Sequence, residues 1–117
     1  MTPPLHPQGE GWTKGPWEVR QSQIGTLYVS STEGREVARV IFRPFGEHEA
    51  NARLIAAAPD LYEALSDAVM FIELVRLRAR REGDTQQEIE AQDALRNAQS
   101  ALTKARTPDT LSEGGER

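Results

Sequence analysis

Alternating apolar and polar positions in the first third of the chain predict strands. The alternation begins at 17–19, directly after a Gly-Pro step, as expected of a half-buried strand. Residues 26–30 and 36–42 are rich in β-branched and aromatic side chains, which favour strands. Glycine-containing segments at 23–25 and 31–34 predict the two turns. We therefore expect a three-stranded antiparallel meander, whose third strand buries Ala38, Val40 and Phe42 and turns Val37, Arg39 and Ile41 to the other face.

Helix-forming residues dominate from Glu47 onward, and a sheet this small needs such a helix packed against it. A short helix is expected to end near Ala57, because Pro59 lacks an amide hydrogen and restricts the residue before it. The pattern leaves open whether Pro59 kinks one helix or separates two. The second helix is expected to run from Pro59 to about Glu82. Its apolar stripe has three- and four-residue steps, at Leu61, Leu65, Ala68, Ile72, Val75 and Ala79.

A third helix is predicted over about 85–106. Gly83 suits the left-handed position that ends the preceding helix, and Asp84 suits an N-cap with Gln87 three residues later. The short turn makes the last two helices an antiparallel hairpin. The apolar side of the third helix comprises Ile89, Ala91, Ala94, Leu95, Ala98, Ala101, Leu102 and Ala105. The fold class is therefore α+β: a small N-terminal antiparallel β-meander, a short helix and a long antiparallel helical hairpin.

The 117 residues fit one domain, which we place at 12–106. The flanking segments 1–11 and 107–117 are rich in proline, glycine and polar residues, and we expect both to be disordered tails. The helix at 59–82 has more apolar surface than one partner would cover, and the helix at 85–106 has an alanine-rich side. These two surfaces predict a homo-oligomer, at least a dimer.

Composition excludes several classes of function. The chain has no cysteine, and its two histidines lie far apart in sequence, so we expect no metal site. The net charge of -4 disfavours nucleic-acid binding, which usually needs a basic surface. No apolar run approaches the roughly 20 residues of a membrane span, and no signal-peptide pattern is present, so we expect a protein of the bacterial cytoplasm.

No catalytic motif is present, so we predict that the protein is not an enzyme and needs no cofactor. The basic residues are nearly all arginines, whose planar forks suit phosphates and carboxylates. Arg76 and Arg80 lie four residues apart on one helix face and could form an anion site. The alternative is a solvated cationic helix end that pairs with Glu82 and Asp84.

A second polar group lies at the predicted junction between sheet and helix. It comprises Arg39, Arg43, His48, Asn51 and Arg53, near the first turns of a helix, where backbone amides attract anions. The alternative is structural, with Asn51 capping the helix and Arg53 paired with an acidic neighbour. The candidate ligand-binding residues are thus Arg39, Arg43, Asn51, Arg53, Arg76 and Arg80. Two tryptophans, Trp12 and Trp17, are expected to cover the sheet rather than to stack on a ligand.

Three segments resemble short proteins of bacteriophages and prophages. The segment TKGPWEV at 13–19 is similar to the opening of that group, and ANARLIAAAPDL at 50–61, followed by EAL at 63–65, is more specific to it. The closing helix at 94–105 also resembles the group's ending, so the similarity covers most of 13–106.

The order of a small sheet and then a long helical hairpin also resembles phage sponge proteins that sequester the cyclic nucleotide signals of Thoeris and CBASS immunity. Those sponges are non-enzymatic oligomers that hold phosphate-bearing signals partly through arginines. The resemblance implies a phage anti-defence protein whose partner is a cyclic nucleotide or another nucleotide-derived signal. The alternative is a protein-binding inhibitor or adaptor, such as an anti-CRISPR, that occludes a host defence protein.

Overall fold

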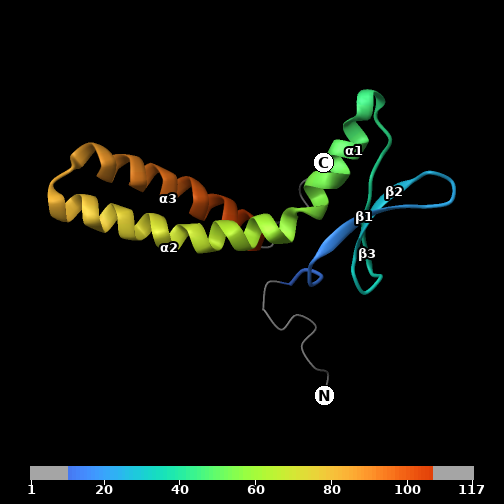
Figure 1. Cartoon of the computed structure of the whole chain (residues 1–117), viewed down its shortest axis with the longest axis horizontal. Coiled ribbons are helices and arrows are strands. Elements are labelled where there is room, and N and C mark those ends of the chain that lie inside the picture. The colour runs from blue at the N-terminus through green and yellow to red at the C-terminus, as the bar shows by residue number, and fades with distance from the viewer. Residues whose placement is uncertain (1–10, 107–117) are drawn as a thin grey trace, which may run out of the picture. The chain divides into compact units, whose positions relative to one another are not determined.

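The structure is a computed structural model and describes residues 11–106. Its elements confirm the predicted α+β class (Figure 1). The predicted tails, 1–11 and 107–117, lie outside the described residues apart from Gly11. The chain divides into two compact units between Glu63 and Ala64. In chain order the elements are β1 (Trp17–Gln21), β2 (Leu27–Ser31), β3 (Glu36–Arg39), the 3-10 helix η1 (Pro44–Gly46), α1 (Glu47–Ala56), α2 (Ala58–Glu82) and α3 (Thr85–Arg106).

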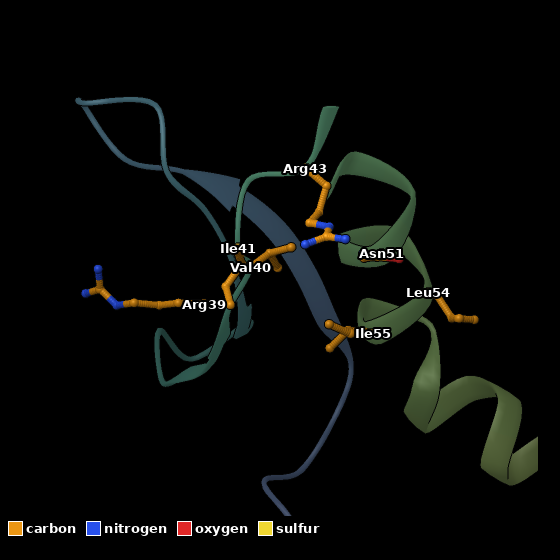
Figure 2. Close-up of a pocket in the computed structure, with 7 residues that line it drawn as sticks. All are labelled: Arg39, Val40, Ile41, Arg43, Asn51, Leu54 and Ile55. Atoms are coloured by element: carbon orange, nitrogen blue, oxygen red, sulfur yellow. The ribbon is translucent and has the colours of Figure 1, made fainter. Parts of the chain in front are cut away.

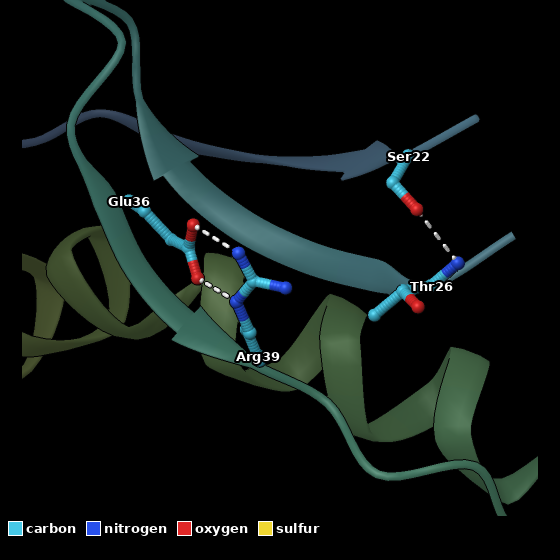
Figure 3. A network of polar contacts seen from close by, with 4 residues as sticks. All are labelled: Ser22, Thr26, Glu36 and Arg39. Carbon is cyan, nitrogen blue, oxygen red and sulfur yellow. Dashed lines mark hydrogen bonds and ion pairs between the residues drawn. The ribbon is translucent and has the colours of Figure 1, made fainter. Parts of the chain in front are cut away.

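The three strands form an antiparallel sheet in the order β1-β2-β3, as the meander predicts. Ser22 closes the turn between β1 and β2, because its Oγ accepts a hydrogen bond of 3.0 Å from the amide of Thr26 (Figure 3). Gly25 in this turn has a φ of 93°, which glycine adopts without the steric penalty of a side chain. The predicted turn at 23–25 is therefore confirmed.

The third strand is shorter than predicted. Its last bond to β2 is donated by the amide of Val40 to the carbonyl of Leu27, at 2.9 Å. Leu27 is the first residue of β2, and the residues before it form the turn with β1, so β3 has no partner strand beyond this point. The predicted strand residue Phe42 consequently lies outside the sheet with 73% of its surface exposed, and its predicted burial is wrong.

A bulge between β2 and β3 also changes which residues face the core. Val29 pairs with Ala38, but Ser30 pairs with Glu36, so Val37 is one residue in excess. Val37 packs against the core, although the simple alternation predicts that it faces away. The register downstream of the bulge keeps Val40 buried, as predicted.

The core of the first unit lies between the sheet and α1, which contacts both β1 and β2. Val29 and Ala52 are fully buried, and Val40 is nearly so. Burial of an aliphatic side chain of this size contributes about 1.5–3 kcal/mol, so a few such residues matter in a small unit. The half-buried side chains around this centre are Trp17, Leu27, Val37, Ile55 and Ala56.

The segment before β1 packs against the start of α2. A Cβ atom added to Gly15 would lie 2.9 Å from the Cβ of Pro59, closer than real Cβ contacts come. Trp12 meets Tyr62 edge to face, with ring centroids 4.7 Å apart. Trp17 packs on the core cluster, and its indole Nε1 donates to a backbone carbonyl four residues earlier, at 3.0 Å. Both tryptophans therefore have packing roles.

Pro59 separates two helices, which settles the alternative that the sequence leaves open. The break falls at Ala57, whose amide still donates to the carbonyl of Arg53 at 3.0 Å. Its carbonyl accepts from the amide of Leu61 at 2.9 Å in the following helix. Pro59 is thereby at the second residue of α2, where an amide hydrogen would have no intrahelical acceptor.

In the second unit α3 runs back antiparallel to α2, which confirms the predicted hairpin (Figure 1). Gly83 has a φ of 77°, and its amide donates to the carbonyl of Arg80. The amide of Asp84 donates to the carbonyl of Ala79 at 2.9 Å. These two bonds make the Schellman ending of a helix. Asp84 then caps α3, because its Oδ1 accepts from the amide of Gln87 at 3.1 Å. The predicted roles of Gly83 and Asp84 are both confirmed.

The hairpin buries one stripe of each helix. On α2, Leu65, Ala68, Ile72 and Val75 are half-buried and Ala79 is fully buried, whereas Leu61 is exposed, contrary to its place in the predicted stripe. On α3 the buried residues are Ala91, Leu95, Ala98 and Leu102. Ile89, Ala94, Ala101 and Ala105 are exposed, so the predicted apolar side is too wide. A helix with one neighbouring helix buries a narrow seam, which accounts for the difference.

Within residues 11–106, no helix combines the length and the apolar character that crossing a membrane requires.

Candidate functional site

A pocket of about 380 Å³ lies in the first unit, where the chain leaves β3 and returns as α1 (Figure 2). Its volume falls within the roughly 300–1,000 Å³ of small-molecule sites. Three of the six predicted ligand-binding residues line it, together with four apolar residues. The lining residues are Arg39, Val40, Ile41, Arg43, Asn51, Leu54 and Ile55.

The pocket has an apolar floor and an exposed apolar rim. Val40 is buried in the core and Ile55 packs against it, so these two side chains are held in place. Ile41 and Leu54 remain 78% and 64% exposed at the edges. The sequence-based interpretation missed all four of these residues. A usable signal was present in α1, because Asn51, Leu54 and Ile55 have the i, i+3, i+4 spacing of one helix face.

Arg43 is the cation that faces the pocket. Figure 2 shows its guanidinium between the segment that contains Val40 and Ile41 and the helix α1. Its Nε lies 3.6 Å from Oε1 of Glu47, a loose ion pair between two side chains that are each 59% exposed. The segment that carries Arg43 is anchored, since Nδ1 of His48 donates to the Arg43 carbonyl at 2.9 Å. The His48 ring also packs on Phe42, with centroids 4.6 Å apart.

Asn51 lines the pocket from within α1, not from its first turn. The helix begins at Glu47, and its N-cap is Gly46, so the expected capping role of Asn51 is wrong. The same shift removes the expected contribution of backbone amides beside Asn51, because amides in the helix interior bond along the helix. The carboxamide of Asn51 is exposed and offers both a donor and an acceptor to a ligand.

Arg39 lines the pocket, but its guanidinium does not. Its guanidinium points away from the other lining side chains (Figure 2). It pairs with Glu36 on the other face of the sheet, through Nε at 2.5 Å and a second nitrogen at 3.2 Å (Figure 3). The sequence correctly predicts that Arg39 faces away from the core. Because of that orientation its charge does not reach the pocket.

The other three candidate residues lie elsewhere. Arg53 is exposed in the last turn of α1 and does not line the pocket. Within the described part of the chain, it has no carboxylate within 4.0 Å, so the expected pairing with Glu47 or Glu49 is wrong. Arg76 and Arg80 belong to the second unit.

Arg76 and Arg80 are both engaged by carboxylates. Arg76 donates to Glu73 at 2.5 Å, and this hydrogen bond raises the pKa of Arg76 above its usual value. Arg80 lies 4.0 Å from Glu88 on α3. Of the partners that the structural alternative predicts for this helix end, Glu82 pairs with Arg78 at 3.3 Å, whereas Arg76 and Arg80 pair with Glu73 and Glu88. Paired arginines at a helix end fit that alternative better than an anion site.

Acidic residues and histidines do not assemble into a metal centre in the described ranges. No three of them cluster closely enough to hold an ion among residues 11–106.

The comparisons with known proteins show a family for this chain. The family model described as Salmonella phage P22 protein Y8K6 matches residues 1–109. No curated protein and no solved structure matches the chain.

Proposed function

The chain belongs to the Salmonella phage P22 protein Y8K6 family, and we propose that this phage accessory protein acts by binding, through sequestration of a nucleotide-derived immune signal. Sequestration needs a pocket and affinity but no chemical step. The proposal places the signal in the pocket between the end of β3 and α1. It thereby gives the anti-defence role implied by the sponge resemblance a specific location.

The observation that supports the proposal is a guanidinium above an apolar floor. A nucleotide-derived signal has a flat base and an anionic phosphate, so it needs an apolar surface and a cation a few ångströms apart. Val40 and Ile55 provide the first and Arg43 the second. Arginine suits this role because its fork can donate two parallel hydrogen bonds to one phosphate.

The neighbours of Arg43 determine how it would meet a phosphate. Glu47 approaches its Nε, so the two terminal nitrogens stay available to a ligand. The loose 3.6 Å pair orients the guanidinium without a short hydrogen bond that a ligand would have to break. Asn51, four residues after Glu47 on the same helix face, would bond to a base edge or a sugar hydroxyl.

Arg43→Ala is the direct test, with Arg39→Ala as the matched control. The probes are 3′,5′-cyclic AMP, cyclic di-AMP, cyclic di-GMP and cyclic ADP-ribose, titrated by calorimetry into the full chain. Loss of a charge-assisted hydrogen bond is expected to weaken binding of the recognised probe about 10- to 100-fold in Arg43→Ala. Arg39→Ala should change affinity less than about threefold, because that guanidinium is held by Glu36 on the other face. Equal losses in both variants, or no binding of any probe, would contradict the proposal.

A second candidate function rests on the apolar residues that follow β3. Ile41, Phe42 and Phe45 are 78%, 73% and 99% exposed, and large exposed apolar side chains close together mark protein-binding surfaces. The alternative is that the protein occludes a host defence protein with this loop. Phe45→Ser distinguishes the two functions. Loss of host-protein capture with unchanged nucleotide binding would favour occlusion.

A further inference from the structure

One face of α2 in the second unit carries large apolar side chains that nothing among the described residues covers. Met70, Phe71 and Leu74 are 73%, 69% and 61% exposed, and Leu77 is 41% exposed. The face that packs toward α3 includes Leu65, Ala68, Ile72, Val75 and Ala79. Each position of the exposed series 67, 70, 74, 77 and 81 lies two residues after one of these. Two residues correspond to about 200° around a helix, so the two series occupy opposite faces.

Charges of opposite sign mark the two ends of this exposed face. Asp67 lies at its start, and Arg78 and Arg81 lie at its end. Neither Asp67 nor Arg81 has an ion partner within 4.0 Å among residues 11–106, although Arg78 pairs with Glu82 at 3.3 Å. Asp67 and Arg81 are fourteen residues apart, about four helical turns. Leu74 lies midway between them.

We propose that this face of α2 binds the same face of a second copy of the chain, antiparallel, about a twofold axis near Leu74. In that arrangement Asp67 of each copy lies beside the Arg78–Arg81 end of the other. A parallel pair would instead place Asp67 beside Asp67 of the other copy, and Arg81 beside Arg81 of the other copy. Like charges would then repel at both ends of the face. The apolar residues at spacings of three and four would meet in the middle, as in the seam of an antiparallel coiled coil.

The pattern favours a second copy over a different partner because the face is complementary to itself. A twofold axis places each residue opposite its mirror position in the series. When the series Asp67, Met70, Leu74, Leu77, Arg81 is paired with its own reverse, the acidic end lies opposite the basic end and apolar residues lie opposite apolar residues. The proposal goes beyond the proposed function, since the pocket lies in the first unit and this face lies in the second.

A charge exchange on the full chain tests the proposal, read out by sedimentation and native mass spectrometry. The wild-type chain is expected to be dimeric at micromolar concentration. Asp67→Arg alone, or Arg81→Asp alone, creates two like-charge contacts per dimer and should raise the dissociation constant roughly tenfold or more. The double variant Asp67→Arg/Arg81→Asp restores opposite charges and should restore the dimer. Circular dichroism of each variant checks that the helices remain folded.

Matched controls place the same charge changes on exposed positions of α3. Glu90→Arg and Lys104→Asp lie outside the proposed face and should leave the dimer unchanged. A monomeric wild-type chain would overturn the proposal, even if the exposed face of α2 then proved to bind a different protein. A dimer that ignores both single reversals would overturn it too. Single reversals that weaken the dimer without rescue by the double variant would refute the antiparallel arrangement. None of these outcomes depends on nucleotide binding.

Discussion

At the residue scale, two of the three segments that carry the phage resemblance meet each other in the first unit. Gly15 of the TKGPWEV segment lies against Pro59 of the ANARLIAAAPDL segment. The adjacent Trp17 packs on the core that α1 completes. Gly15, Trp17 and Pro59 therefore act in folding, whereas three other residues of the ANARLIAAAPDL segment, Asn51, Leu54 and Ile55, line the pocket. The ANARLIAAAPDL segment thus combines packing residues with residues of the candidate site.

The close approach of Gly15 and Pro59 predicts a steric cost. Gly15→Ala would place a Cβ 2.9 Å from that of Pro59, so overpacking should destabilise the first unit by about 1–3 kcal/mol. Pro59→Gly removes the obstructing ring. The penalty of Gly15→Ala should then shrink in a Pro59→Gly background, as urea denaturation of all four variants would measure. An equal penalty in both backgrounds would show that the contact is not its cause.

The candidate site also shows the limits of sequence reasoning at the residue scale. The sequence correctly places Arg39, Arg43 and Asn51 near one junction. It does not determine that Arg39 turns to Glu36 while Arg43 turns to the pocket, because side-chain direction depends on where β3 stops. β3 stops where its partner strand β2 begins at Leu27, because the residues before Leu27 form the turn with β1. A strand end that is set by the length of the partner strand leaves no local pattern in the sequence of β3.

At the element scale, local signals predicted the helices better than the sheet. The caps at Gly83 and Asp84 and the interruption at Pro59 each depend on a single residue's conformational preference, and each is confirmed. The bulge opposite Ser30 depends on pairing between two strands, and the alternation in β3 did not reveal it. Helix ends can thus be predicted from the sequence of this chain, because they depend on interactions between residues that are close in sequence.

The N-cap of α3 provides a prediction at this scale. Asp84→Ala removes the acceptor for the amide of Gln87 and should cost about 1 kcal/mol of stability. Asp84→Asn keeps an oxygen at the same place and should cost far less. Thermal unfolding followed by circular dichroism at 222 nm would compare the two variants with wild type. Equal melting temperatures for the alanine variant and the wild type would be inconsistent with a capping role.

At the scale of the whole molecule, the two units have different tasks in this account. The first unit contains the pocket with Arg43, and the second contains the exposed face of α2. The sequence predicted a dimer from excess apolar surface, but it did not separate the covered stripe of α2 from the exposed one. That distinction requires the packing of α3, which buries Ala79 and leaves Leu74 exposed.

The proposed separation of tasks predicts independent effects of mutations. Arg43→Ala should abolish ligand retention without changing the subunit count, because Arg43 belongs to the first unit. Arg81→Asp should lower the subunit count, and each separate chain should still retain the ligand in its pocket. Native mass spectrometry of both variants reports the two quantities together. A single variant that loses both at once would show that the pocket is built between copies.

The most direct test of the central claim, that this phage protein holds a nucleotide-derived signal, is native mass spectrometry of protein purified from cells with active immune signalling. A denatured portion of the same sample separates a bound small molecule from a covalent change. The account predicts an added mass of nucleotide size on the wild-type chain that is absent from Arg43→Ala and retained by Arg39→Ala. A wild-type chain that carries no small molecule, even after incubation with the cyclic nucleotide panel, would contradict it.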